Sequence, residues 1–384
     1  MPDPAARDPW GLPPWKIDFR APKLPLPESV DVAIVGGGFS GLSTAAWLRH
    51  LSPQTSVALF EASHIGAGAS GRTGGMVLAE TAAGDLPGLG DVLGGLSDIL
   101  RKLDVDCDLL LPGAWEVGHG GEPFDKSSGV PVASSPIHWS DSGELQVVSE
   151  VPGGSLDPGK LVSGLADAAH RLGAQIFEHQ PVRGIEWRPQ PVLQLSGGKT
   201  RTKKVLIAAN ALSLDLSGLA DKAQPRLTLA ASSAPLSDER VAAIGLAERR
   251  PFYTVDLPYL WGRLCSNNSI VWGAGLVSPP KSGELVDLDI TAPEPSRMFA
   301  SLERRVRGLH PALASVRFTH QWGGPISFRE SWSPAFAQRR QSNDGIVLGA
   351  YAGHGVALSV YLGSWAAEAM LGRRSLPQWG RLDS

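Results

Sequence analysis

The sequence predicts an α/β fold built from two domains, and three observations support this. An apolar run, a glycine-rich turn, a helical stretch and a second apolar run follow one another within about 30 residues, the order of a βαβ unit. The 384 residues are 42% hydrophobic, enough for packed cores in two or three domains. The 45 glycines and 31 prolines show no triplet period, which excludes a collagen-like chain and places them in turns.

Charge and cysteine usage exclude several classes of protein. Charged residues are only 19% of the chain and the formal net charge is −3, so we expect neither nucleic acid nor an anionic membrane as a partner. Cys107 and Cys265 have no CxxC neighbour, which argues against a zinc ribbon and a disulfide scaffold, and no metal site is expected. The Pro-rich first 28 residues lack the apolar core of a signal peptide, which predicts an extended arm and a cytoplasmic protein.

One long apolar run needs a separate interpretation. Residues 346–367 contain no Asp, Glu, Lys or Arg and are long enough to cross a bilayer. Four glycines and His354 interrupt the run, however. A buried strand, a glycine turn and a packed helix explain it better than a membrane span.

The first βαβ unit carries a glycine fingerprint. Residues 30–35 are a β-branched run that predicts a buried strand, residues 42–49 predict a helix, and residues 56–61 predict the next strand. Between the first strand and the helix stands Gly36-x-Gly38-x-x-Gly41, in the context that gives this pattern its meaning.

The chemistry of this pattern is dinucleotide binding. Gly36 permits a tight turn, Gly38 lets a pyrophosphate approach the backbone, and Gly41 allows close packing of helix on strand. The helix N-terminus offers free N–H groups and a positive dipole end to the phosphates. Glu61, which closes the second strand, is placed to accept hydrogen bonds from ribose hydroxyls.

The remaining elements follow from the same patterns. Asp157-Pro158 starts a helix with apolar residues at helical spacing, and Gly173 stops it. Residues 84–154 read as irregular and rich in Gly, Pro and Ser. Further strands are expected at 175–177, 192–195, 204–209 and 269–272, and helices at 297–308 and 355–371.

A second glycine-dense loop, residues 66–76, is longer than a nicotinamide enzyme needs after its acidic residue and suggests backbone wrapped over a large flat ligand. Here the sequence resembles the FAD-dependent glycine/D-amino-acid oxidase (DAO) family. The Ser-Gly-Arg-x-Gly-Gly form is most similar to the gamma-glutamylputrescine oxidase branch. The resemblance continues in order at 156–158, 173–174, 180–182, 206–210, 322–325 and 346–358.

The resemblance implies FAD as cofactor and a division of the chain into domains. Residues 1–29 would form the extended arm, residues 30–85, 155–225 and 323–384 a discontinuous Rossmann-like FAD-binding domain, and residues 86–154 and 226–322 a substrate domain with a mixed, mainly antiparallel sheet plus helices. The expected cofactor-binding residues are Gly36, Gly38, Phe39, Ser40 and Gly41; Glu61 and Ala62; Ala69, Ser70, Gly71, Arg72, Thr73, Gly74, Gly75 and Met76; Val182; and Gly353, His354, Gly355, Val356, Ala357 and Leu358.

The implied reaction is oxidation of a carbon–nitrogen bond in a primary or secondary amine. The neutral amine would pass a hydride from its α-carbon to flavin N5, and water would hydrolyse the resulting imine; O2 or another carrier would accept the electrons. No side-chain nucleophile is required, because the cofactor carries this chemistry. The helix after Gly355 would direct its dipole at the pyrimidine edge of the flavin, with His354 as an assisting donor and Arg72 as added positive charge.

Two departures from the family pattern shape the choice of substrate. Relatives that oxidise amino acids carry an Arg, two residues after the counterpart of Gly324, that clamps the carboxylate; Ile326 stands there, and Arg329 is the possible substitute. Relatives that activate oxygen use a Lys where this chain has Val271. An amino-acid oxidase or dehydrogenase, and a flavin-binding protein without turnover, therefore stay open as alternatives.

The attachment of the flavin and the lining of the substrate pocket are also predicted. The chain has no Cys after Cys265 and no His in the glycine-dense loop, so FAD is expected to bind noncovalently. The expected pocket residues come from the central segment and the glycine motif after it, namely Trp261, Arg263, Trp272 and Trp322.

Overall fold

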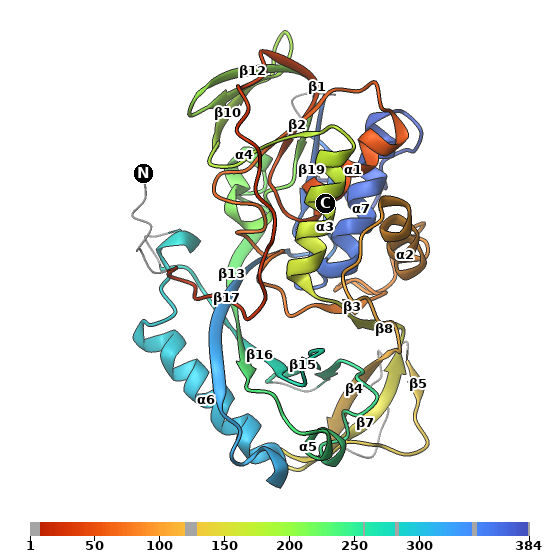
Figure 1. Cartoon of the computed structure of the whole chain (residues 1–384), viewed down its shortest axis with the longest axis vertical. Coiled ribbons are helices and arrows are strands. Elements are labelled where there is room, and N and C mark those ends of the chain that lie inside the picture. The colour runs from red at the N-terminus through yellow and green to blue at the C-terminus, as the bar shows by residue number, and fades with distance from the viewer. Residues whose placement is uncertain (1–7, 120–128, 256–257, 281–283, 340–343, 383–384) are drawn as a thin grey trace.

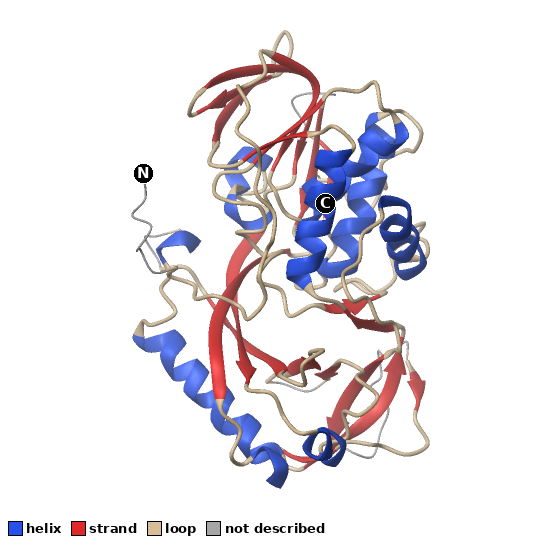
Figure 2. Ribbon diagram, viewed as in Figure 1, coloured by secondary structure: helices blue, strands red, loops and turns tan. Residues whose placement is uncertain are grey.

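The chain folds around two large β-sheets, one in the upper and one in the lower half of the molecule as drawn in Figures 1 and 2. A two-stranded sheet, β3 (Met76–Leu78) with β8 (Gly153–Ser155), lies between them. The computed structural model describes residues 8–119, 129–255, 258–280, 284–339 and 344–382.

The upper sheet has eight strands with a parallel centre. The strands of that centre, in spatial order, are β19 (Gly345–Gly349), β12 (Gly198–Ile207), β1 (Ser29–Val35), β2 (Val57–Phe60) and β9 (Gln175–Phe177). Three antiparallel strands extend it, namely β10 (Val182–Glu186), β11 (Val192–Leu195) and β18 (Ala335–Gln338). All of β2 and β19 is buried, as expected for parallel strands covered on both faces.

Helices cover one face of this sheet. They are α1 (Phe39–Leu51), α2 (Val92–Leu103), α3 (Pro158–Arg171) and α7 (Gly355–Met370). The side chain of Asp157 caps α3 by accepting from Lys160 N. Small hydroxyl residues join α1 to α7: Ser43 Oγ donates to Val360 O at 2.7 Å, and Thr44 Oγ1 donates to Gly363 O at 2.8 Å. This close pairing fixes the position of the α7 N-terminus relative to that of α1.

The lower sheet has nine strands, antiparallel except for the parallel pair β14 and β4. Its strands are β4 (Ala114–His119), β5 (Val130–Pro131), β6 (His138–Ser140), β7 (Glu144–Val151), β13 (Ala223–Ser233), β14 (Phe252–Thr254), β15 (Trp261–Leu264), β16 (Ile270–Val277) and β17 (Phe318–Arg329). Helices α5 (Asp238–Ala243) and α6 (Pro293–Leu309) pack on its outer face around a core that contains Trp272 and Phe299. A single-turn helix, α4 (Leu214–Ser217), and short 3-10 turns at 210–212, 285–287 and 311–313 complete the described elements.

The predicted elements of the upper half form where the glycine and apolar patterns place them. The apolar run at 346–367 divides into β19, a turn and α7, and no helix among the described residues is long and apolar enough to cross a bilayer. Residues 84–154 are the clearest error, because this segment contains α2 and β4 to β8 rather than irregular chain. Glycines inside α2 obscured its helical signal, and Leu145, Val147 and Val151 in β7 carry an alternation that was overlooked.

Two elements cross the predicted domain boundaries. β17 runs through residue 323 and pairs along its whole length with β13 of the lower sheet. Helix α2, placed with the substrate domain from sequence, packs in the helical layer of the upper sheet. The division into an FAD-binding and a substrate domain therefore stays a prediction in its details.

Candidate cofactor and active site

The glycine fingerprint forms a tight turn between β1 and α1. Gly36 has φ +110°, a backbone conformation that favours glycine. A Cβ added to Gly41 would lie only 2.0 Å from Gly36 O, so only glycine lets the helix begin this close to the strand. Gly38 is the N-cap of α1 and contributes no side-chain cap, and Phe39 and Ser40 are buried in the first turn.

Glu61 lies beside this turn. Its carboxylate accepts from Gly37 N at 2.8 Å and from Ser63 N at 2.9 Å. A carboxylate offers about four lone-pair sites, so it retains capacity for ribose hydroxyls. Gln180 N donates to Glu61 O at 2.8 Å, which brings the start of β10 at Val182 close to the same end of β2. Ala62, the next residue, is exposed.

The second glycine-dense loop is docked on the start of α1. Ser70 Oγ accepts from Phe39 N at 2.9 Å, so the loop and the fingerprint form one continuous backbone surface. Ala69, Thr73 and the Met76 at the start of β3 are partly buried, whereas Gly71, Gly74 and Gly75 are buried.

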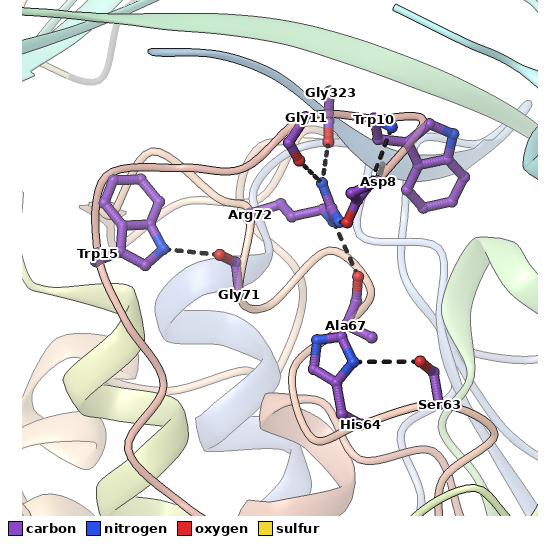
Figure 3. A network of polar contacts seen from close by, with 10 residues as sticks. All are labelled: Asp8, Trp10, Gly11, Trp15, Ser63, His64, Ala67, Gly71, Arg72 and Gly323. Carbon is purple, nitrogen blue, oxygen red and sulfur yellow. Dashed lines mark hydrogen bonds and ion pairs between the residues drawn. The ribbon is translucent and has the colours of Figure 1, made fainter. Parts of the chain in front are cut away.

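The N-terminal arm covers this loop, and Arg72 joins the two (Figure 3). Arg72 forms an ion pair with Asp8 and donates to Gly11 O at 2.6 Å and to Ala67 O at 3.0 Å. The ring of Trp10 lies 5.4 Å from the guanidinium carbon. We call these contacts of Arg72 the arm clasp. The guanidinium group of Arg72 is thus directed at partners in the arm and the loop. This geometry does not favour the predicted role of Arg72 as a positive charge at the flavin.

Tryptophans extend the contact between the arm and the loop. Trp15 Nε1 donates to Gly71 O at 2.7 Å, and Trp322 Nε1 donates to Arg72 O at 2.8 Å. The two indole rings meet edge to face with centroids 5.4 Å apart. Trp15 thus connects the arm to the lower sheet, a contribution that sequence analysis missed.

The C-terminal motif forms a strained turn that leads into α7. Ala350 and Ala352 both have left-handed φ values, +56° and +52°, and Ala350 N donates to Asn210 Oδ1 at 2.9 Å. Such conformations cost about 1–2 kcal/mol each and gather at functional sites. Exposed Gly353 leads to His354, the N-cap of α7, and Val356, Ala357 and Leu358 are buried, so their side chains face the core rather than a ligand.

The two helix N-termini lie in one region. Ser40 Oγ and Tyr351 Oη are 2.6 Å apart, and a Cβ added to Gly363 would lie 2.7 Å from Ser40 O. Gly363 lies eight residues after the start of α7. At a rise of 1.5 Å per residue, α7 therefore begins about 12 Å from Gly363 along the helix axis. Burial raises the pKa of Tyr351, which keeps this hydroxyl neutral.

His354 has a defined tautomer at the start of α7. Its Nδ1 lies 3.2 Å from Ala352 O. A carbonyl oxygen only accepts, so Nδ1 carries the proton and Nε2 is the acceptor of the neutral ring. To act as the predicted assisting donor through Nε2, His354 would therefore need a second ring proton, on Nε2.

The inner face of the lower sheet carries a line of side chains in register across its strands, which we call the cross-strand row. Neighbouring members are paired residues on adjacent strands: Ser149, Glu116, Tyr253, Trp261, Gly273, Ala230 and Trp322. The residues that flank them in sequence, such as Trp115, Phe252 and Trp272, point into the core on the opposite face. The row faces the loop, because Trp322 bonds Arg72 and a Cβ added to Gly74 would lie 2.2 Å from the Trp261 ring.

The predicted pocket residues divide between the two faces. Trp261 and Trp322 belong to the row, and Arg263 Nε donates to Gly74 O. The prediction for Trp272 is wrong: its side chain is fully buried on the outer face, where its ring lies 5.3 Å from that of Phe252. The alternation of β16 would have separated it from Val271, which packs with Trp322 on the inner face.

Arg329 is placed away from the row. It lies an odd number of residues from Trp322 along β17, so its side chain points to the other face of the strand, whereas Ile326 shares the face of Trp322. The Arg329 guanidinium donates to Pro334 O at 3.2 Å and to Arg381 O at 2.7 Å. This placement speaks against Arg329 as a carboxylate clamp.

The arrangement fits a long anionic cofactor. Aspartate side chains cap α2 and α3, and α6 begins with a proline, which has no backbone N–H. The N-cap residues of α1 and α7 provide no side-chain cap, and apart from Phe39 N, which donates to Ser70 Oγ, the first N–H groups of both helices can be presented to a ligand. These features define a dinucleotide-binding flavoprotein fold with a second sheet placed over the cofactor loop.

Comparison with known proteins agrees with this class. Residues 31–369 match the DAO family, described as FAD dependent oxidoreductase, and the chain belongs to that family. Gamma-glutamylputrescine oxidoreductase of Escherichia coli (strain K12) is 26% identical over 393 residues, covering 92% of this chain and 86% of that protein.

Two solved structures show the shared fold. Glycine oxidase from Geobacillus kaustophilus has a TM-score of 0.69 at 18% identity and covers 91% of this chain and 96% of its own. L-Amino acid deaminase from Proteus myxofaciens has a TM-score of 0.73 at 16% identity and covers 95% and 94% of the two chains. Membership of the family of FAD-dependent oxidoreductases makes FAD the cofactor of this protein and oxidation by FAD its chemistry.

Proposed function

We propose that the protein oxidises a C–N bond of a primary or secondary amine, bound between the cross-strand row and the loop of residues 66–76. FAD, when bound, would supply the acceptor for the hydride from the α-carbon of the amine. The chain itself holds the loop against α1, presents two helix N-termini whose N-cap residues provide no side-chain cap, and covers the loop with the aromatic side chains of Trp261 and Trp322.

One observation favours an amine over an amino acid. Ile326 stands on the inner face of β17, at the position where the resemblance places a carboxylate-binding Arg in amino-acid oxidising relatives. Arg329, the possible substitute, donates to backbone carbonyls on the other face. An apolar side chain offers no partner to a substrate carboxylate next to the reacting carbon.

The residue assignments are part of the same proposal. Gly36, Gly38 and the N–H groups of α1 would hold the pyrophosphate, Glu61 the ribose, and the loop and the α7 N-terminus the flavin. We further propose that FAD is held without a covalent bond. Acid precipitation tests this, because a flavin that remains with the pellet would overturn it.

The function is tested by anaerobic reduction of the FAD-loaded protein. Primary amines, secondary amines and α-amino acids are added singly, and the loss of the oxidised flavin absorbance is followed. We expect amines to reduce the flavin. Reduction by α-amino acids alone would favour the amino-acid oxidase alternative, and no reduction by any compound would favour a flavin-binding protein without turnover. Readmission of O2 then shows whether oxygen accepts the electrons.

A further inference from the structure

A tyrosine hydroxyl lies between two carboxylates at one end of the cross-strand row. Tyr253 Oη is 3.1 Å from Glu80 Oε1 and 3.0 Å from Glu116 Oε1. Ser149 Oγ donates to the other oxygen of Glu116. Glu116 is only 4% exposed and Glu80 is half-buried, so hydrogen bonds within the protein matter for both carboxyl groups.

Proton counting assigns the hydrogen bonds of this chain. A tyrosine hydroxyl has one proton and can donate to only one of two acceptors. The two oxygens of Glu116 accept from Ser149 and from Tyr253, so Glu116 is one acceptor for the Tyr253 proton. Tyr253 can donate to Glu80 while Glu80 is ionised; once Glu80 takes up a proton, Glu80 can donate to Tyr253 Oη and Tyr253 can donate to Glu116. The chain therefore offers a place for one additional proton, on Glu80.

The position of Glu80 places this proton at the candidate active site. Glu80 follows β3, the strand that continues the glycine-dense loop, and its partner Tyr253 is paired in register with Trp261 above that loop. His354, the N-cap of α7, is close enough to act on the charge of Glu80. Glu80 thus lies among the loop, the start of α7 and the inner face of the lower sheet.

The electrostatic surroundings favour the protonated form of Glu80. Burial raises the pKa of Glu80 above its ordinary value, and the negative charges of Glu116 and Asp85 act in the same direction. His354 and the Tyr253 hydroxyl act in the opposite direction. Burial also raises the pKa of Tyr253, so its hydroxyl stays neutral and can donate to Glu116 while it accepts from a protonated Glu80.

We propose that Glu80 is the base that takes the proton from the ammonium form of the substrate, and that Tyr253 and Glu116 are positioning residues that hold this proton on Glu80. The step rests on the proposed amine oxidation. An N–H bond of the ammonium breaks, an O–H bond forms on Glu80, and the electron pair stays on nitrogen; nothing is oxidised or reduced. The freed lone pair is what the substrate needs before its α-carbon can release a hydride. Water takes the proton from Glu80 after each turnover.

The first test follows the rate of anaerobic flavin reduction against pH. For an amine that is an ammonium ion in solution, Glu80→Gln should lower the second-order reduction rate at neutral pH by about 100-fold, the low end for loss of a general base. Tyr253→Phe should lower it by about tenfold. Both losses should shrink as the pH approaches the pKa of the amine, and should vanish for an amine that is already neutral at the assay pH. Glu144→Gln, an exposed change on β7 of the same sheet, is the matched control and should match the wild type.

The second test does not depend on turnover. Infrared difference spectra of the FAD-loaded protein between acidic and alkaline pH should show one carboxylic acid C=O band that titrates above the ordinary glutamate range. The band should be absent in Glu80→Gln and present in Glu144→Gln, with flavin content and absorbance spectrum unchanged.

The outcomes separate the inference from the proposed function. A pH profile of Glu80→Gln equal to that of the wild type, or an infrared band that survives in Glu80→Gln, overturns the role of Glu80. If no amine reduces the wild-type flavin, the proposed amine oxidation fails and the base loses its substrate. The infrared band of Glu80 then still reports whether the chain holds the additional proton.

Discussion

Replacing Asp8 by Asn tests the arm clasp. The substitution removes the charge that faces Arg72, whose side chain is 6% exposed, while its size and the other partners of Arg72 remain. Removing one partner of a fully buried ion pair costs about 3–5 kcal/mol. Asp8 is 24% exposed and water screens the pair, so we expect a smaller loss, about 1–2 kcal/mol.

This loss should appear in FAD binding, because Arg72 lies within the loop that faces the cofactor. At 1.4 kcal/mol per tenfold change, the Kd for FAD should rise about 5- to 30-fold. The assay is titration of the deflavinated protein with FAD, followed by the quenching of flavin fluorescence. Thermal unfolding with and without FAD shows whether the arm or the whole fold is weakened.

Asp18→Asn is the matched control, since Asp18 is an exposed aspartate on the same arm and its backbone N–H, not its carboxylate, donates to Ser163 Oγ. Its FAD affinity should equal that of the wild type. If Asp8→Asn binds FAD within twofold of the wild type while remaining folded, the arm does not support the loop and the interpretation of Arg72 is wrong.

The remaining predictions concern the row, the inner face and pH. Ile326→Arg should speed flavin reduction by α-amino acids at least about tenfold, the effect of one charge-assisted hydrogen bond, and an unchanged rate at full FAD content would contradict the placement of that face. Gly273→Ala would put a Cβ 2.0 Å from the Trp261 ring, so the free energy of unfolding measured in urea should fall by about 1–3 kcal/mol. Folding raises the pKa of Glu80, so a proton on Glu80 stabilises the folded protein below the unfolded pKa of about 4.3, and this stabilisation is lost as the pH rises through the folded pKa. Glu80→Gln should therefore remove this part of the dependence of the free energy of unfolding on pH. A lysine and a serine hydrogen-bond the Asp31 carboxylate and hold its pKa at about 2, so its contribution is present above pH 3.8 and lost as the pH falls towards 2; Asp31→Asn should cost about 1 kcal/mol at pH 7.

The upper half of the molecule could be predicted because its signals are local. The strand at residues 30–35 ends at consecutive glycines, and the helix after Asp157 has both its start and its stop residue. Each of these signals lies within one element, where backbone preference and burial agree. The helix α2 escaped because paired glycines within it weaken the same local signal.

The cross-strand row could not be predicted from any local pattern. Glu116, Tyr253 and Trp322 meet only because strands far apart in sequence pair in one register, and a shift of a single residue would turn each of them to the other face. Arg72 shows the same limit at the level of one side chain. The residue type of Arg72 suggested a positive charge at the flavin, but its guanidinium group pairs with Asp8, which lies 64 residues away in sequence.

The helix N-termini show a signal that sequence analysis could have used. Asp91, Asp157 and Ser237 cap α2, α3 and α5, as the preferences for those positions require. Gly38 and His354 stand at the same position of α1 and α7 and provide no side-chain cap. Each missing cap costs about 1 kcal/mol in the free protein, and the oxygens of a bound ligand would supply the missing acceptors. Helices α4 and α6 also lack a side-chain cap, but α4 is a single turn and α6 begins with a proline. The missing caps of α1 and α7 therefore agree with the proposal that these two helices face the cofactor, and FAD binding should raise the thermal stability of the protein through those two N-termini.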